Sequence, residues 1–444
     1  MSKIQVLTKN FGALTIIQAA NFFVPFITLP IIVRIIGPDK FGTLNFLLAI
    51  VTYFALFINY GFDYTATRTI AQNSNDASVV NAVFFKVFYA KILLFIISIA
   101  LFAVMVIYIP QIKKNIAISI FYFAGTLSNV FLPNWLFQGK QQLPKAAIFN
   151  LAVKVISSVV MILIIRKSSD YGWYAILTSA SQLAVGFLLF WYAFKKFNIK
   201  WVSVRISDIF SLLYLDRMIF ISTLMISIYT TSNIVILGFM RPDNEVGIYT
   251  AAARIVGIVQ TLTLLPLSQT LFPYISKSFA QNRESGIQEV KKIFPLISLF
   301  TLLLSIALFI FSPLIIHILF GSAFNKAILV LRILSFNPFI ISLSNLMGVQ
   351  TILNLKKDKI FLYITLVGSV LSILFNIVIT HYYNYLGTAV SWVLTELIIV
   401  LSMIFVLKNE GIRLVDRQYF NTTYLFSVYK RLQLVTRQKL NLTS

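Results

Sequence analysis

Long apolar stretches follow one another along almost the whole of this 444-residue chain. Each has about the twenty residues that an α-helix needs to cross the roughly 30 Å hydrocarbon layer of a bilayer. A run such as KILLFIISIALFAVMVIYI does not alternate every second residue, as the strands of a membrane barrel do, so helices are predicted. The sequence therefore predicts an all-α integral membrane protein with twelve spans, at 10–33, 42–62, 82–109, 115–137, 146–166, 171–194, 218–239, 247–273, 293–317, 326–350, 360–381 and 385–407.

The composition excludes a soluble enzyme. Hydrophobic residues make up 59% of the chain and charged residues only 11%, whereas soluble domains have about 25% charged residues. No cysteine occurs, which excludes disulfides, thiol catalysis and Cys-ligated metals. The two histidines, His317 and His381, are far apart in the sequence. Neither a bound cofactor nor a metal site is expected.

The basic residues are distributed along the chain as a membrane topology requires. Thirty-seven Lys and Arg against 14 Asp and Glu give a net charge of +23. If the N-terminus is cytoplasmic, 25 basic residues fall in cytoplasmic segments, 8 in the opposite loops and 4 inside spans. This bias follows the positive-inside rule, so both termini are predicted to be cytoplasmic. A nucleic-acid partner is not needed to explain the charge.

The two sets of six spans resemble each other. IIGPDKFGTLNF follows the first span and FMRPDNEVGIYTAA follows the seventh, and two later pairs of turns also correspond. Repeats of six spans insert with the same orientation, and lobes duplicated in this way commonly enclose the substrate path of an alternating-access transporter. We expect a two-lobed transporter with a central cavity, made of a six-helix lobe at 1–194, a basic cytoplasmic linker at 195–217, a second six-helix lobe at 218–407 and a basic cytoplasmic tail at 408–444. The tail either lies against anionic headgroups at the inner surface or is disordered.

Several basic residues fall where hydrocarbon is expected. A charged side chain at the centre of a bilayer costs about 2.5–3.5 kcal/mol on insertion scales, so such residues usually face water or a partner. Residues near span ends can instead extend their charge to the interface. Because basic groups outnumber acids, a cationic cavity is predicted, suited to an anionic ligand such as a phosphate or diphosphate. The predicted ligand-binding residues are Arg34, Lys91, Lys154, Arg254 and Arg332.

Two acidic residues, Asp63 and Glu396, lie in or beside predicted spans. Each either pairs with a nearby Lys or Arg or titrates during transport. The sequence leaves both alternatives open. The second alternative would couple transport to a proton or sodium gradient.

Several motifs in the chain point to a known family. The opening stretch NFGALTIIQAANFFVPFITLPIIVRIIGPDKFGTLNF resembles the first two helices of Wzx-type O-antigen flippases, in the polysaccharide transport branch of the multidrug/oligosaccharidyl-lipid/polysaccharide superfamily. YGFDYTATRTIA at 60–71 and LPNWLFQGKQQL at 132–143 are similar to the same family, as are VGIYTAAARI at 246–255 and FISLSNLMGVQ after Pro338. The motifs occur in order across most of the membrane region and do not cover the tail.

The resemblance implies a function. Family members flip undecaprenyl-diphosphate-linked O-units from the cytoplasmic to the periplasmic leaflet of the bacterial inner membrane, for lipopolysaccharide biosynthesis. It implies lipid-linked oligosaccharide and membrane lipids as partners, and O-antigen polymerase and a chain-length regulator as candidate protein partners. Arg34 and Arg254 match basic positions in family-like motifs, which in the family are thought to meet the sugar-diphosphate head. Asp63 stands where the family pattern often has Asn.

Other classes of membrane protein fit the sequence less well. A cation-coupled drug or metabolite exporter of the same superfamily would favour an acid-lined cavity, and another exopolysaccharide exporter remains an alternative. A membrane enzyme such as a polymerase or ligase typically has a large outward loop, whereas the outward loops at 166–170 and 241–246 are short. A major-facilitator transporter usually has a Gly-Arg-rich loop where this chain has ATRTIAQNSNDASVV. No enzymatic activity is therefore predicted.

Overall fold

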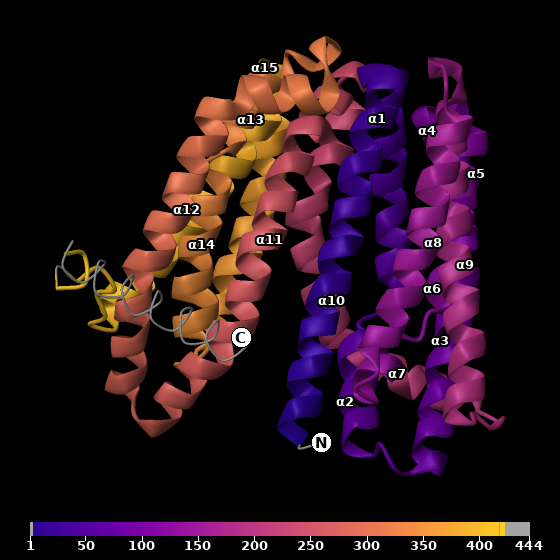
Figure 1. Ribbon diagram of the computed structural model, residues 1–444, viewed down its shortest axis with the longest axis horizontal. Helices are drawn as coiled ribbons and strands as arrows, with labels where there is room; N and C mark the ends of the chain where they lie inside the picture. Colours follow the sequence, from indigo (N-terminus) through magenta and orange to yellow (C-terminus); the bar gives the residue numbers. More distant parts are fainter. Residues whose placement is uncertain (1–2, 417, 422–444) are drawn as a thin grey trace, which may run out of the picture. The chain divides into compact units, whose positions relative to one another are not determined.

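The structure, a computed structural model, describes residues 3–416 and 418–421, apart from the side chains of 3–23, 226, 229, 265–270 and 273. Helices joined by short connections make up these residues, and none of them forms a β-strand. The chain divides into two compact units (Figure 1). Unit 1 comprises the residues up to Thr250 together with His317–Asn325, and unit 2 comprises Ala251–Ile316 and the residues from Lys326 onwards.

The helices of unit 1 come from the first half of the chain, apart from one short helix of the second half. They are α1 (Lys3–Asn59), α2 (Phe62–Gln72), α3 (Ala77–Tyr108), α4 (Pro110–Lys114), α5 (Ile116–Gly125), α6 (Ser128–Phe131), α7 (Asn134–Gly139), α8 (Leu143–Ile164), η1 (Ser168–Asp170), α9 (Tyr171–Phe197), α10 (Ile206–Met240) and η2 (Ser322–Phe324).

Two long helices have residues in both units, and four further elements belong to unit 2. The shared helices are α11 (Asp243–Gln281) and α12 (Arg283–Phe320). The remaining elements are α13 (Ala327–Leu334), α14 (Asn337–Ser344), the π-helix η3 (Asn345–Ile352) and α15 (Asp358–Asn409).

The two longest helices are each broken between two predicted spans. In α1 the break is at Gly37, whose backbone (φ 76°, ψ 173°) has a positive φ outside the helical region, which favours glycine. Pro38 follows it. In α15 the break is at Asn384, with φ 55°, and Asn is among the few residues that tolerate a positive φ. The breaks fall where the sequence predicts short loops between spans.

The helices have the length and apolar character that a membrane protein needs. In the described part of the chain, nine helices could cross a membrane by length and composition, or ten if the bent α10 counts as one span. The segment Val24–Gln72 overlaps two predicted spans, and so does Asp358–Asn409. A multi-pass all-α membrane protein is therefore confirmed, and the count of twelve spans stays a prediction.

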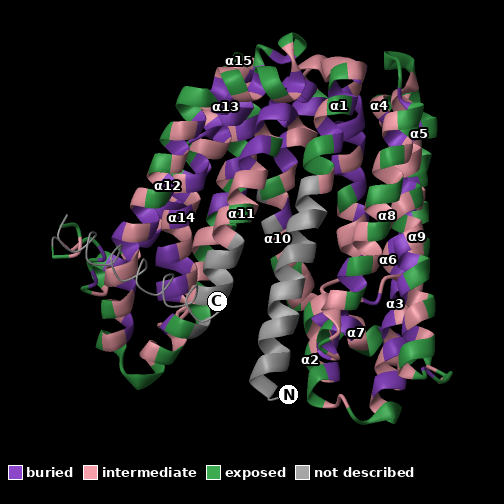
Figure 2. Ribbon diagram, in the orientation of Figure 1, coloured by how far each residue is buried: buried purple, intermediate pink, exposed green. Residues whose placement is uncertain are grey.

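Exposed residues occur along the middle of several helices (Figure 2), and many of them are apolar. On α3, Ile96 is 58% exposed and Leu101 49%, and on α8, Ile156 is 64% exposed and Val159 52%. Exposed apolar patches of this kind mark surfaces that meet lipid or a partner. These faces are the ones expected to contact acyl chains.

Each unit also has its own apolar core. In unit 1, Phe84, Phe85, Trp135 and Phe137 are almost fully buried together, so that α3 packs against α7 and α9. Aromatic side chains bury large apolar areas and pack edge to face. The core of unit 2 brings α12, α14, η3 and the second half of α15 together. These cores fix the positions of the charged residues that follow.

The fourth predicted span, 115–137, is not one helix but the three short helices α5, α6 and α7. Pro133 causes the second break, because it has no N–H to donate to the carbonyl of Asn129 and restricts the residue before it. Leu132 is accordingly extended (φ −81°, ψ 106°). The discontinuity leaves backbone carbonyls of this span without their helical donors.

The predicted linker and tail are only partly extended chain. Helix α9 ends at Phe197 and α10 begins at Ile206, so much of the segment 195–217 is helical. The tail is described as far as 416 and at 418–421, and the predictions for its remaining residues lie outside the described part. The lobe boundaries, the linker and the central cavity stay predictions.

Candidate functional site

Among the described side chains of unit 1, the most deeply buried basic residue is Lys91 on α3, which is 1% exposed. Its Nζ donates to the backbone oxygen of Asn129 at 2.9 Å and to Oδ1 of Asn59 at 3.1 Å. A third, longer contact of 3.5 Å joins it to the backbone oxygen of Leu132. An ammonium has three donors, and all three are used on neutral oxygens.

The oxygens around Lys91 are held in place by further hydrogen bonds. Asn59, the last residue of α1, donates from Nδ2 to Oδ1 of Asn129 at 3.0 Å. Asn129 in turn donates from Nδ2 to the backbone oxygen of Thr126 at 3.0 Å. A buried polar network is rigid when its members are satisfied. The arrangement ties α1, α3 and the discontinuous fourth span together.

Asp63 lies in the first turn of α2, directly after the reversal of the chain at Tyr60 and Gly61. A negative charge is favoured at a helix N-terminus by the helix dipole. Its carboxylate also interacts electrostatically with the ammonium of Lys91. In unit 1, the structure therefore brings Asp63 and Lys91, both predicted from the sequence, close enough for their charges to interact.

Arg34 lies just before the break in α1, and its guanidinium caps the last turn of α12. Nη2 donates to the backbone oxygens of His317, at 3.0 Å, and Ile318, and Nε donates to that of Leu319 at 3.2 Å. The carbonyls at a helix C-terminus lack helical donors and carry partial negative charge, so a cation is favoured there. These contacts lie within unit 1.

Lys154, Arg254 and Arg332 have different surroundings. Lys154 is half-buried on α8, and Arg254 is exposed on α11. In unit 2, Nε of Arg332 donates to Oγ of Ser312 at 3.2 Å, and its guanidinium lies 5.5 Å from the ring centre of Phe309. Cation–π contacts of this kind are favourable within about 6 Å.

Glu396 is 4% exposed within unit 2, on the second half of α15. The two halves of α15, on either side of Asn384, pack closely, since a Cβ on Gly368 would lie 2.8 Å from Cγ1 of Ile399. Ser372, one turn after Gly368, is also buried.

The structure brings only two of the predicted site residues into electrostatic interaction. Lys91 and Asp63 interact, whereas Arg34 and Arg332 have separate partners in their own units. Substrate binding by Arg34, Lys91, Lys154, Arg254 and Arg332 stays a prediction, as does ion coupling by Asp63 and Glu396. Within the described residues, no three His, Cys, Asp or Glu side chains gather as a metal site would require.

Sequence reasoning missed an ionic cluster at one end of unit 2. Nη2 of Arg283 lies 3.3 Å from Oε2 of Glu410, and Lys357 pairs with the other carboxylate oxygen. Nζ of Lys291 lies 3.2 Å from Oδ2 of Asp416. The hydrogen bond from Lys357 holds the pKa of Glu410 below its ordinary value. The residues after α15 are thereby attached to α12 and to the start of α15.

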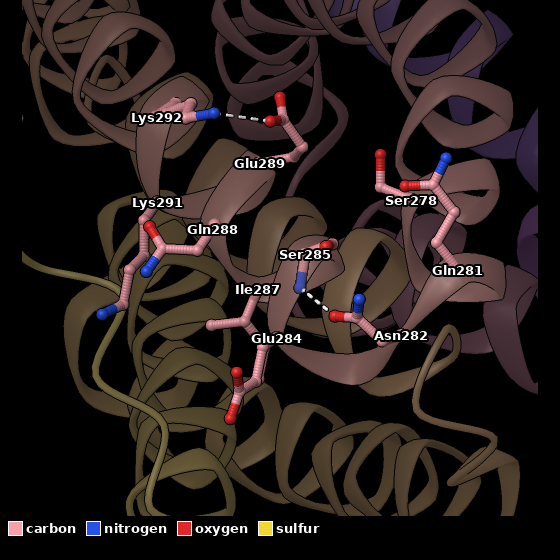
Figure 3. Close-up of a pocket in the computed structure, with 10 residues that line it drawn as sticks. All are labelled: Ser278, Gln281, Asn282, Glu284, Ser285, Ile287, Gln288, Glu289, Lys291 and Lys292. Carbon is pink, nitrogen blue, oxygen red and sulfur yellow. Dashed lines mark hydrogen bonds and ion pairs between the residues drawn. The ribbon is translucent and has the colours of Figure 1, made fainter.

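A polar pocket of about 610 Å³ lies beside this cluster, at the turn between α11 and α12 (Figure 3). Asn282 caps α12 there, accepting at Oδ1 from the N–H of Ser285 at 2.7 Å. Lys292 and Glu289 form an ion pair of 2.7 Å. The lining residues are Ser278, Gln281, Asn282, Glu284, Ser285, Ile287, Gln288, Glu289, Lys291 and Lys292.

Sequence reasoning also missed Asn59, which completes the surroundings of Lys91. Its position at the end of an apolar run, directly before Tyr60 and Gly61, was the available signal. The other two oxygens belong to the backbone, and the type of a residue does not show where its backbone oxygen points. Only the Asn129–Pro133 spacing, with Pro133 four residues after Asn129, indicates a freed carbonyl.

Known proteins resemble this chain over most of its length. A protein of Escherichia coli (strain K12), provisionally named an O-antigen transporter, is 29% identical over 404 residues, which cover 91% of this chain and 97% of the relative. The solved structure of the lipid II flippase MurJ in an inward closed conformation has a TM-score of 0.69 at 14% identity, covering 89% of this chain and 87% of that one.

A multidrug resistance MATE family transporter of the MOP superfamily, in an inward-facing conformation, has a TM-score of 0.67 at 14% identity and covers 87% of this chain and 93% of that one. At this identity the two structures show the fold alone, and they confirm the all-α transporter fold predicted from the sequence. Residues 7–279, more than half of the chain, match the family described as polysaccharide biosynthesis protein. The chain therefore belongs to the polysaccharide biosynthesis protein family.

Proposed function

We propose that this chain is a flippase for undecaprenyl-diphosphate-linked O-antigen repeat units. It moves each unit from the cytoplasmic to the periplasmic leaflet of the inner membrane by alternating access, with both termini in the cytoplasm. The observation that carries the proposal is the similarity, over 91% of the chain, to the relative provisionally named an O-antigen transporter. The family match over 7–279 supports a role in polysaccharide biosynthesis, in which a lipid-linked saccharide is the substrate class that we assign.

The basic residues suit such a substrate. A diphosphate offers several anionic oxygens, and a guanidinium binds them with up to five donors in a fixed plane. Arg254, exposed on α11, and Lys154, half-buried on α8, are the residues that we assign to the headgroup. The polyprenyl tail stays in lipid, so transport requires no covalent step.

The energy source and the protein partners belong to the same proposal. Glu396 and Asp63 are the acids that would respond to a proton or sodium gradient. O-antigen polymerase and a chain-length regulator would receive the unit after it reaches the outer leaflet.

Complementation of a deletion strain tests the proposal. Without the gene, lipid-linked O-units should accumulate on the cytoplasmic side, and the wild-type gene should restore O-antigen display. Arg254→Ala should abolish O-antigen display while the protein level stays the same, because the diphosphate headgroup no longer has the guanidinium of Arg254 to bind it. Arg166→Ala, an exposed arginine at the end of α8, is the matched control and should display normally.

A drug or metabolite exporter would give the opposite pattern. The deletion would then raise sensitivity to organic cations and leave O-antigen display intact. Normal display by Arg254→Ala at native expression would contradict the assigned headgroup contact even if the deletion phenotype held.

A further inference from the structure

The two backbone oxygens around Lys91, those of Asn129 and Leu132, lack their helical N–H donors. In a continuous helix, the carbonyl of Asn129 would accept from residue 133, which is a proline without an N–H. The carbonyl of Leu132 would accept from Leu136, but the N–H of Leu136 bonds to Pro133 instead, at 3.0 Å. Both carbonyls are therefore freed by the local sequence. Within a membrane, such groups need another donor or a cation.

The freed carbonyls converge with one amide oxygen on a single point. Nζ of Lys91 occupies that point, at 2.9 Å from Asn129, 3.1 Å from Asn59 and 3.5 Å from Leu132. Carbonyl and amide oxygens that replace a hydration shell are the ligands by which proteins bind hard monovalent cations. The carboxylate of Asp63, which interacts with Lys91 over a longer distance, supplies negative charge to the same region.

We propose that these oxygens form a binding site for a monovalent cation, and that the ammonium of Lys91 fills it as a tethered cation. The site belongs to unit 1 and is built by Asn59, Asn129 and Leu132. Because the ammonium is covalently attached, unit 1 takes no sodium or potassium ion from solution at this place. Any cation that drives transport then binds elsewhere in the protein.

This role differs from the substrate contact predicted for Lys91 from the sequence. A residue that meets the substrate has to expose its charge, whereas the side chain of Lys91 is 1% exposed and its three donors are used. The inference does not depend on the proposed flippase function, since it concerns the binding of a cation by the protein alone.

The proposal is tested on the purified full-length chain. Thermal midpoints of the wild type and of Lys91→Ala are compared in sodium, potassium, methylammonium and choline chloride at equal ionic strength. The wild type should unfold at the same temperature in all four salts. Lys91→Ala should unfold earlier in choline, and at least one small cation should restore several degrees in a saturable manner, because a bound ligand stabilises the folded state.

Three variants separate a cation site from a general effect of salt. Lys91→Met fills the space of the side chain and should show no response to cations. Asn59→Leu, added to Lys91→Ala, removes one ligand of the cation. The cation concentration that gives half of the stabilisation should then rise at least tenfold. Lys154→Ala removes a half-buried lysine of the same unit and should behave like the wild type in all salts.

Several outcomes would overturn the proposal. One is a Lys91→Ala protein whose midpoint is the same in every salt, and another is a wild type that responds as strongly as the variant. If Lys91→Ala yields no folded protein, Asn59→Asp is added to it, so that a carboxylate strengthens the cation site. Recovery of monodisperse protein in a small cation and not in choline is then expected, and failure in all salts counts against the site.

Discussion

Lys91 in unit 1 and Glu410 in unit 2 stabilise their surroundings in opposite ways. The ammonium of Lys91 is buried and bonded to neutral oxygens, whereas the carboxylate of Glu410 is partly exposed and paired with Arg283 and Lys357. In a medium of low dielectric, a lost partner leaves a buried group with its full desolvation cost, while water and salt screen an exposed pair. Burial therefore matters more to stability here than the presence of opposite charges.

Loss of the Lys91 ammonium should lower the thermal stability of the protein more than any other change considered. Lys91→Met keeps the length of the side chain but leaves the carbonyls of Asn129 and Leu132 without a donor, at about 1–3 kcal/mol for each buried acceptor. The thermal midpoint of the purified protein should fall markedly. Lys154→Met, a half-buried lysine on α8, is the control and should change the midpoint little. Equal midpoints for the two variants would contradict the importance of burial.

Asn59→Leu should have an intermediate effect. Asn59 accepts from Lys91 and donates to Asn129, so the variant loses two buried hydrogen bonds of about 1 kcal/mol each. The two backbone acceptors of Lys91 remain. The thermal midpoint measures the loss, and Asn73→Leu is the matched control, because Asn73 donates only within α2, to the backbone oxygen of Thr69. A larger loss for Asn73→Leu would refute this account.

Glu410→Gln should have a small effect that depends on salt. The variant removes the negative partner of Arg283 and Lys357, but the side chain is accessible to water. The wild-type and variant midpoints should differ measurably at low ionic strength and coincide at high salt, since screening weakens exposed pairs. Glu284→Gln, an exposed glutamate on the same α12, is the control. A difference that persists at high salt would show that the pair is shielded from water.

The smallest effect should be a local change with pH. Asp416 and Glu410 have pKa values lowered below the ordinary 3.8 and 4.5, through hydrogen bonds from the backbone of Gln418 and from Lys357. Their stabilisation is therefore complete above the ordinary values and is lost as the pH falls through the lowered ones, below about pH 4. A spin label on Gln418→Cys should become more mobile over that range.

The spin label can be attached at a single site, and one outcome of the measurement would contradict the prediction. The chain contains no cysteine, so Gln418→Cys gives a single labelling site. A label on Ser207→Cys, exposed near the start of α10, serves as the control and should keep its spectrum. Mobility at position 418 that is unchanged between pH 6 and the acid range would mean that Asp416 and Glu410 do not hold this segment.

The two regions also differ in how far the sequence predicts them. Apolar runs indicate the spans because length and hydropathy largely decide membrane insertion. A lysine within such a run is recognisable from the sequence because charged residues are rare there. Two of the three partners of Lys91 are backbone oxygens near Pro133, some forty residues further along the chain, and a residue type does not show where a carbonyl points. Arg283 and Glu410 are separated by 127 positions, so their contact depends on the tertiary fold.

The discontinuous fourth span has a consequence for the biogenesis of the protein. Helix α3, which carries Lys91, is synthesised before Asn129 and Leu132. Neither the ammonium of Lys91 nor the two freed carbonyls are fully satisfied in lipid alone. The two segments are expected to enter the bilayer as a pair, so a nascent chain that stops before Pro133 should remain at the insertion machinery.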